Sequence, residues 1–169
     1  YSVIGKNSGG GTDVLIAAAK DEIVESFGIL CEDSGLRLKT ADLQHFALVN
    51  LFEVTYPKLA QAQDETIVLL DFGAQKTNLI IYRNKSVYFT KELNIGGIVL
   101  TEEIQRQMGL SYLEAEDLKI NGDEGGNLPQ EILDIVGTML DAFFSEIKKS
   151  LNFFMTSTSI ESVDHCYIT

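Results

Sequence analysis

Two apolar runs separated by a short turn constrain the fold of this chain most. The first run, Thr66–Leu70, ends in Asp71, and the second begins at Leu79 after a turn centred on Gly73. This pattern predicts a buried strand, a tight turn and a returning strand. A carboxylate at the tip is poorly placed for stability but well placed to meet a cation and its phosphates. A hairpin whose Asp71 only hydrogen-bonds its own turn fits the same pattern.

Length, charge and composition limit the class of protein. The chain has 169 residues, 45% hydrophobic and 22% charged, which suits a soluble globular protein with one core or two small ones. Its formal net charge of −12 argues against nucleic acid and anionic lipid as partners. No apolar run approaches the roughly 20 residues that span a bilayer, and no signal peptide is recognisable. Cys31 and Cys166 lack disulfide-framework or zinc spacing, so a reducing cytoplasm is expected.

The first third of the chain is expected to alternate strands and helices. Its expected elements are a polar loop (5–12), a buried strand (13–19), a helix (20–34), a short strand (36–40), a second helix (41–52) and a connector (54–65). The first helix should carry Ile23, Phe27, Leu30 and Cys31 on one apolar face. Either Thr40 or Asp42 should cap the second helix.

The remaining residues continue this alternation after the hairpin. The expected elements are a strand (86–93), a helix (101–108), a helix (111–120), a loop (121–128), a long helix (129–156) and a closing strand (163–169). Thr101 should cap the first of these helices, and Ser111 with Glu114 should form a capping box on the next. The apolar stripe of the long helix is expected to be core rather than a cofactor site. The alternation predicts an α/β fold.

The order of these motifs resembles the second half of an actin-like, ribonuclease H-like, nucleotide-binding fold. The run Asp71-Phe-Gly-Ala-Gln-Lys-Thr77 resembles its second phosphate-binding loop, and Gly96-Gly97 resembles the glycine turn that follows. Ala115-Glu116-Asp-Leu-Lys119 is similar to a segment whose side chains flank adenosine. From the order and spacing of these motifs, the chain is identified as a member of the type IV pilus assembly family PilM, which is similar to the division protein FtsA.

The resemblance implies a mixed β-sheet with flanking helices in two partial lobes of a longer protein. Residues 1–19 would end an inserted subdomain, and residues 20–65 would end the first lobe. Residues 66–169 would form the second lobe, with a helical part at about 98–128. The chain would begin after the family's first phosphate loop and stop before its adenosine-binding glycines, so one of three nucleotide-binding elements is expected in it.

The resemblance also implies roles toward ATP and Mg²⁺. Asp71 would hold a Mg²⁺-bound water, and Gly73 and Ala74 would present backbone N–H groups to the β- and γ-phosphates. Gln44 would occupy the place of the residue that orients the attacking water, but glutamine is a poor base, which favours binding over turnover. The implied nucleotide-binding residues are Asp71, Gly73, Ala74, Gln75, Thr77, Gly96, Gly97, Glu116 and Lys119.

Several polar residues keep two interpretations. Lys76 either adds positive charge near phosphate or is a solvated turn lysine. Glu116 and Lys119, one helical turn apart, either clamp the nucleoside or form an ordinary surface ion pair.

His45 and His165 are isolated in the sequence, and each is expected to be a hydrogen-bonded core or surface residue without a metal or catalytic role.

The implied function is an ATP-binding scaffold of the type IV pilus assembly platform, cytoplasmic and peripheral to the inner membrane. It would hold the cytoplasmic peptide of a PilN-like inner-membrane protein and meet other pilus assembly components, with no nucleic acid and no membrane insertion. The alternative is an ATPase or filament-forming protein of cell division or type II secretion, and self-association into a homo-oligomer is left open. For this chain alone, weak nucleotide binding and no ATP hydrolysis are expected.

Overall fold

A computed structural model describes residues 2–6, 9–123 and 125–169 of the chain. The described residues form two compact units. The N-terminal unit comprises the residues up to Asp64 together with Tyr82–Tyr88, and the C-terminal unit comprises Glu65–Ile81 and Phe89–Thr169.

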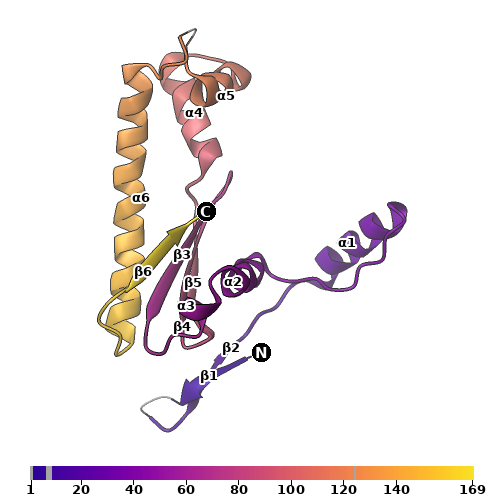
Figure 1. Cartoon of the computed structure of the whole chain (residues 1–169). Helices are drawn as coiled ribbons and strands as arrows, with labels where there is room; N and C mark the ends of the chain where they lie inside the picture. Colours follow the sequence, from indigo (N-terminus) through magenta and orange to yellow (C-terminus); the bar gives the residue numbers. More distant parts are fainter. Residues whose placement is uncertain (1, 7–8, 124) are drawn as a thin grey trace. The chain divides into compact units, whose positions relative to one another are not determined.

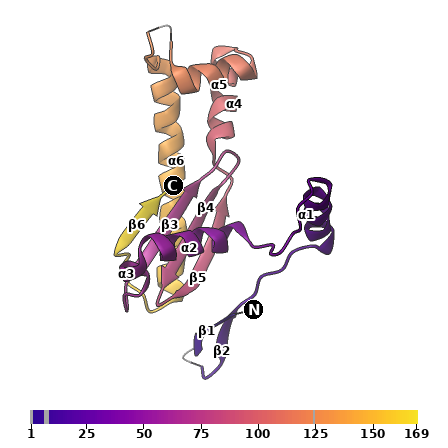
Figure 2. The same cartoon turned by 45° about the vertical axis from the view of Figure 1, so that its right-hand side comes forward.

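The N-terminal unit contains a two-stranded ribbon and three helices (Figures 1 and 2). Its elements are β1 (Ser2–Lys6), which pairs antiparallel with β2 (Thr12–Leu15), and the helices α1 (Asp21–Asp33), α2 (Gln44–Thr55) and α3 (Pro57–Ala60). Strand β1 takes up the start of the loop predicted at 5–12, whose residues 7 and 8 lie outside the described residues. Pro57 begins α3 inside the predicted connector, because a proline suits the first helical position.

Burial in the N-terminal unit differs from the sequence prediction. The strand predicted at 13–19 ends at Leu15, and Ile16 is 72% exposed. Helix α1 forms as predicted, but Ile23 and Phe27 on its apolar face are about half exposed. Residues 36–40 form no strand, since no described segment pairs with them and a strand needs a hydrogen-bonded neighbour.

Helix α2 begins later than predicted. Its N-cap is Leu43, so neither Thr40 nor Asp42 caps it through a side chain. The Asp42 carboxylate instead accepts a hydrogen bond from the adjacent Leu43 N–H at 2.8 Å, which ties down the residue before the helix. The cap prediction was therefore wrong, by one position for Asp42 and by three for Thr40, and only the first lies within the usual spread of helix boundaries.

The core of the N-terminal unit is built around Tyr82. Its ring meets the Phe52 ring edge to face, with centroids 5.6 Å apart. Its hydroxyl donates to Glu53 Oε1 at 2.7 Å and also lies 3.2 Å from the Ala60 carbonyl oxygen. Burial, and then the neighbouring Glu53 carboxylate, raise the pKa of Tyr82 above its usual value of 10.0. One buried residue thus links α2 and α3.

The sheet has the predicted hairpin at its centre. Its strands are β3 (Thr66–Phe72), β4 (Thr77–Arg83), β5 (Ser86–Leu93) and β6 (His165–Ile168), in the order β5-β4-β3-β6. Strand β6 runs parallel to β3, with Ile67 opposite His165 and Leu70 opposite Ile168. The short turns from β3 to β4 and from β4 to β5 suit antiparallel neighbours, so the sheet is mixed. The predicted α/β class with a mixed sheet is confirmed.

Three helices complete the C-terminal unit: α4 (Gly97–Met108), α5 (Tyr112–Asn121) and α6 (Gln130–Ser157). The capping box of Ser111 and Glu114 is confirmed at the start of α5. Thr101 is not a cap: α4 begins four residues earlier, and Thr101 is buried within it. The loop predicted at 121–128 follows α5, although Glu124 lies outside the described residues.

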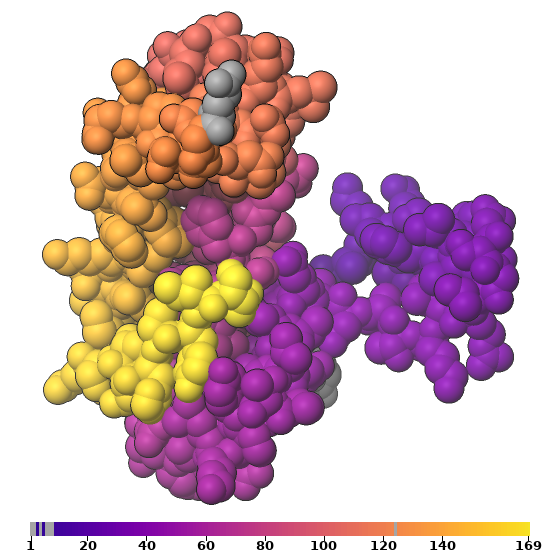
Figure 3. Space-filling model, turned by 45° about the horizontal axis from the view of Figure 1, so that its top comes forward, coloured from indigo at the N-terminus to yellow at the C-terminus, as the bar shows by residue number. Residues whose placement is uncertain are grey.

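Helix α6 joins two parts of the C-terminal unit. Near its start, Ile132 and Ile135 form a buried cluster with Ile104 of α4 and Ala115 of α5, and these helices gather in one mass in Figure 3. Further along, Phe143 meets Phe72 at the end of β3, with ring centroids 5.3 Å apart. The long apolar stripe is therefore largely core, as predicted. No helix within the described ranges is long and apolar enough to cross a membrane.

Candidate functional site

The Asp71 carboxylate is held in place by two neighbouring side chains. Asp71 is the penultimate residue of β3 and is half-buried. Its Oδ2 accepts a hydrogen bond from Asn78 Nδ2 at 2.9 Å, and its Oδ1 accepts one from the Thr169 hydroxyl at 3.3 Å. Because Asn78 is itself buried in β4, the strand pair orients the acid at the end of the sheet.

The turn after Asp71 is tight and requires glycine at its start. The Gly73 N–H donates to the Lys76 carbonyl at 3.1 Å, and a Cβ on Gly73 would stand 2.9 Å from that same oxygen. The Gly73 amide is therefore engaged within the turn, and a phosphate oxygen would have to compete with this bond. Ala74 and Gln75 lie exposed at the tip.

The turn also holds the start of α4. The Gly73 carbonyl accepts from Gly97 N–H at 3.1 Å, and the Ala74 carbonyl accepts from Ile98 N–H at 2.8 Å. A Cβ on Gly96 would stand 2.6 Å from the Ala74 oxygen, which leaves room for glycine alone. The Gly73–Ala74 turn and the Gly96-Gly97 turn, which lie apart in the sequence, therefore form one junction. The first N–H groups of α4 are satisfied by the turn.

Thr77 and Lys76 also bond to other residues of the chain. The Thr77 hydroxyl is buried and donates to the Ile95 carbonyl at 2.7 Å, which secures the loop before Gly96. The Lys76 ammonium forms a half-exposed ion pair with Glu92. The charge of Lys76 is therefore paired with a carboxylate.

Glu116 and Lys119 form a three-residue cluster with Thr101. Lys119 Nζ donates to Glu116 Oε2 at 2.6 Å and to the Thr101 hydroxyl at 2.9 Å, and the Thr101 hydroxyl is hydrogen-bonded to the Glu116 carboxylate. Lys119 Nζ also lies 3.4 Å from the Gly97 carbonyl. Lys119 first, and Thr101 second, hold the pKa of Glu116 below its usual value.

Thr101 is the residue that sequence reasoning missed. The available signal was its place on α4, one turn after Gly97, but that position was interpreted as a helix cap. Of the two interpretations of Glu116 and Lys119, the structure contains the ion pair. Their role toward a nucleoside stays a prediction.

The remaining sequence candidates lie elsewhere. Gln44 is the first residue of α2, in the N-terminal unit, and is exposed. His165 lies 3.1 Å from Glu65 Oε2, as expected of a hydrogen-bonded histidine. His45 Nε2 differs from expectation, because it is buried without a hydrogen-bond partner among the described residues.

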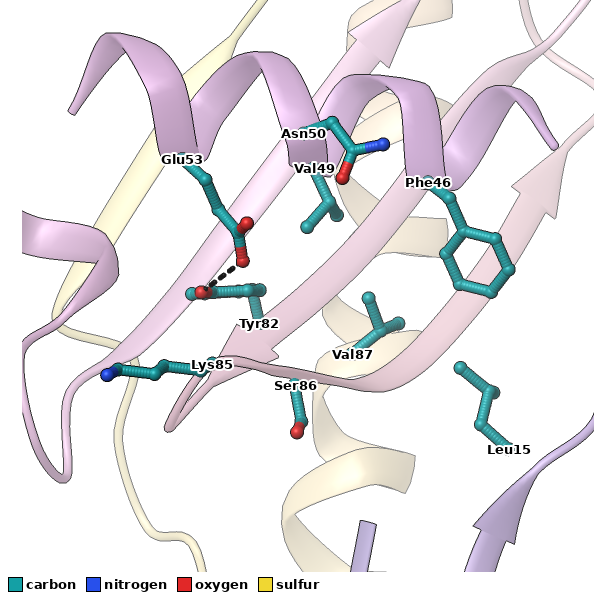
Figure 4. Close-up of a pocket in the computed structure, with 9 residues that line it drawn as sticks. All are labelled: Leu15, Phe46, Val49, Asn50, Glu53, Tyr82, Lys85, Ser86 and Val87. Atoms are coloured by element: carbon teal, nitrogen blue, oxygen red, sulfur yellow. Dashed lines mark hydrogen bonds between the residues drawn. The ribbon is translucent and has the colours of Figure 1, made fainter. Parts of the chain in front are cut away.

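Two of the hollows in the N-terminal unit are of similar size and share the Phe46 side chain. One, of about 310 Å³, is bounded by the Ala17–Ala19 stretch, by Ile23 and Phe27 of α1, and by Phe46 of α2. The other, of about 300 Å³, is lined by Phe46, Val49 and Val87 on one side and by Glu53 and Tyr82 on the other, as Figure 4 shows. The first is therefore the more apolar of the two.

Comparison with known proteins assigns the family. The family model described as type IV pilus assembly protein PilM matches residues 1–169, the whole chain. The chain belongs to the PilM family. Family membership confirms the identification made from the motifs around Asp71, Gly96 and Glu116.

Solved structures of similar proteins share the fold of this PilM family member. A structure described as a PilM-PilN type IV pilus biogenesis complex matches with a TM-score of 0.72 and 27% identity, covering 89% of this chain and 41% of that chain. MreB5 of Spiroplasma citri matches with TM-scores of 0.57 in its AMPPNP-bound form and 0.56 in its ADP-bound form. The two forms are 11% and 14% identical to this chain, covering 80% and 84% of it and 48% and 50% of the MreB5 chains. The predicted actin-like fold is confirmed, and the chain spans less than half of the PilM chain that it matches.

Proposed function

We propose that this chain is part of an ATP-binding scaffold of the type IV pilus assembly platform, cytoplasmic and peripheral to the inner membrane. The observation that carries the nucleotide part is the junction of the Gly73–Ala74 turn with Gly96 and α4, beside an oriented Asp71 carboxylate. In this proposal residues 1–19 end an inserted subdomain, residues 20–65 end the first lobe, and residues 66–169 form the second.

The residues of the junction suit a magnesium nucleotide. Asp71 is a hard oxygen donor, held by Asn78 and Thr169, and would retain a Mg²⁺-bound water. The exposed turn residues Ala74 and Gln75 would face the phosphates. Bound ATP would supply a polyphosphate whose charge the Mg²⁺ partly neutralises.

Glu116 and Lys119 would hold the nucleoside part. To do so, they must exchange bonds with each other and with Thr101 for bonds to the ligand. Because such an exchange returns little net free energy, we expect weak affinity in this chain. The neutral Gln44 amide favours binding over hydrolysis.

Nuclear magnetic resonance titration tests the nucleotide site even at weak affinity. Mg²⁺–ATP should shift the backbone amide signals of Ala74, Gln75 and Gly97. The Asp71→Asn variant should lose these shifts, whereas Asp33→Asn, a matched change at an exposed position of α1, should retain them. Shifts that persist unchanged in Asp71→Asn would count against the site.

The scaffold role in this proposal requires the chain to bind a PilN-like peptide. The matched PilM structure is described as a complex with PilN, and cytoplasmic tails of this kind dock as extended or helical segments in apolar grooves. The hollow beside α1 offers such a surface: Ile23 is 51% exposed and Phe27 is 54% exposed, with the Asp42 carboxylate at its edge. We propose that this hollow takes the tail, with Asp42 near a basic residue of the peptide.

A peptide-binding experiment tests this assignment. The synthetic cytoplasmic tail of the PilN-like protein from the same organism should bind the chain in fluorescence anisotropy. Phe27→Asp should weaken binding about tenfold or more, which corresponds to about 1.4 kcal/mol. Leu113→Asp, at a 79% exposed position of α5, is the matched control and should bind like the wild type. Equal affinities of the two variants would rule out the hollow.

A further inference from the structure

The C-terminal unit contains an apolar pocket next to the Asp71 turn, distinct from the nucleotide residues. Its volume is about 210 Å³, and its walls are Phe72, Ile95, Leu100 and four residues of α6: Val136, Met139, Leu140 and Phe143. All seven side chains are apolar. A dry cavity of roughly 150 Å³ with such walls accommodates a benzene ring, so this pocket has room for one large apolar side chain.

Helix α6 carries an exposed apolar stripe beside this pocket. Leu133 is 45% exposed, Leu140 is 42% exposed and Phe144 is 58% exposed. With Gly137, their spacing of four, three and four residues places them on one helical face. We call Leu133, Gly137, Leu140, Phe144 and the adjoining pocket the α6 face. Figure 1 shows α6 as a long helix.

Gly137 is unexplained by packing within the described chain. It lies inside α6, in the first third of the helix, and a Cβ built on it would meet no atom within 4 Å. A glycine there costs the helix about 1 kcal/mol relative to alanine. A gap in an apolar stripe does, however, let the backbone of another helix approach closely.

The charges along this part of α6 have one sign. Between Gln130 and Ser145 the charged residues are Glu131, Asp134 and Asp141, with no lysine or arginine. At 100° per residue, Asp134 and Asp141 fall next to the apolar stripe. An acidic flank beside an apolar stripe complements a basic amphipathic segment.

We propose that the α6 face docks a basic amphipathic helix of a partner protein, which inserts one large apolar side chain into the pocket. The helix lies along the stripe, its backbone passes close to Gly137, and its basic residues meet Asp134 and Asp141. Helix-in-groove recognition uses apolar anchors at this spacing. The face belongs to α6 and its neighbours, so it is independent of the hollow proposed for the PilN-like peptide.

A synthetic peptide serves as the probe. It has about 18 residues, enough to form a helix, with a Lys-rich polar face, a Leu-rich apolar face and one central Phe. With the methionine methyl groups labelled, the Met139 signal should shift and saturate as peptide is added, because Met139 lines the pocket. The Met155 methyl, which does not line it, should stay in place.

Two matched variants separate docking from general charge attraction. Gly137→Arg fills the gap in the stripe, whereas Thr138→Arg adds the same charge at the next exposed position, turned about 100° around the helix. Both positions are exposed, so both variants should fold. Gly137→Arg should raise the dissociation constant about tenfold or more, and Thr138→Arg should change it less than about threefold.

Four outcomes would contradict the proposal, three of them in the wild type and its arginine variants and one with a changed peptide. The first is an unmoved Met139 signal, and the second is equal weakening by the two arginine variants. The third is a wild-type chain that dimerises in sedimentation while Gly137→Arg stays monomeric, which would make a second copy the occupant. A peptide with Glu in place of Lys should bind at least about tenfold more weakly, and equal binding would contradict the role of the acidic flank.

Discussion

A methyl group on Gly96 would stand 2.6 Å from the carbonyl oxygen of Ala74 and 2.7 Å from that of Gly73. Both oxygens belong to the backbone, so neither can rotate away. The same Ala74 oxygen accepts a hydrogen bond from Ile98 N–H at 2.8 Å, which joins the turn to α4. The turn that follows Asp71 and the glycine turn before α4 therefore depend on each other.

Substituting Gly96 by alanine should disrupt this junction. We expect Gly96→Ala to lower the free energy of unfolding by about 1–3 kcal/mol, the usual cost of forcing extra atoms into a packed site. Urea denaturation measures the change. Gly137→Ala is the matched control, and it should raise stability by up to about 1 kcal/mol, because its Cβ meets no neighbour. Equal stability of Gly96→Ala and the wild type would contradict the close contact.

Removing the Tyr82 hydroxyl should reduce stability at neutral pH. Tyr82→Phe leaves Glu53 and the Ala60 carbonyl without this donor, at a cost of about 1 kcal/mol. Because the pKa of Tyr82 is raised in the folded state, its stabilising contribution is present below pH 10.0 and is lost as the pH rises above that value. The advantage of the wild type over Tyr82→Phe should therefore shrink above pH 10.

Denaturation curves at neutral and alkaline pH check this prediction. The exposed Tyr112 provides the control, because Tyr112→Phe makes the same chemical change outside the core. A pH-independent difference between the wild type and Tyr82→Phe would mean that the folded state does not disfavour the tyrosinate.

The pKa of Glu116 should change more when Lys119 is replaced than when Thr101 is replaced. Both neighbours hold the pKa of Glu116 below 4.5, and Lys119 contributes more. Lys119→Met should therefore raise this pKa further than Thr101→Val does, while Lys119→Arg should keep it low. Carbon-detected titration of the carboxyl signal measures each value, and the reverse order would contradict the cluster.

The same lowered pKa has a consequence for stability in acid. A carboxyl whose pKa is lowered by folding stabilises the folded state above its unfolded value of 4.5. This contribution is lost as the pH falls through the lower folded value. The Thr101–Glu116–Lys119 cluster should therefore stay intact at neutral pH and come apart only in acid below pH 4.5.

ATP hydrolysis by the 169-residue chain is not expected. Gln44, which we propose as the residue that orients the attacking water, is an amide and cannot accept a proton as a carboxylate can. Phosphate release with Mg²⁺–ATP should equal that of Asp71→Ala, which serves as the background. A rate above this background would make the chain an enzyme rather than a binding scaffold.

Local patterns predicted the secondary structure after the hairpin closely. The third strand was predicted at 86–93 and forms at Ser86–Leu93, and the long helix predicted at 129–156 forms at Gln130–Ser157. Strand period, turn residues and helical spacing are properties of adjacent residues. For that reason they can be recognised without knowledge of the fold.

Burial in the N-terminal unit was harder to predict. An amphipathic pattern such as that of Ile23 and Phe27 indicates a face that can be covered, but it does not indicate what covers it. In the described residues both side chains are about half exposed. The missing strand at 36–40 has a similar cause, because a strand forms only beside a partner.

The sequence by itself determined the hairpin, the acid at its tip, the glycines, the long helix and the family. Only the tertiary structure decided that Gly96 rests against the Ala74 carbonyl, that Thr101 joins Glu116 and Lys119, and that an apolar pocket opens beside Phe72. These contacts join residues far apart along the chain. No periodicity encodes such pairs, because they arise from how whole helices and turns pack against one another.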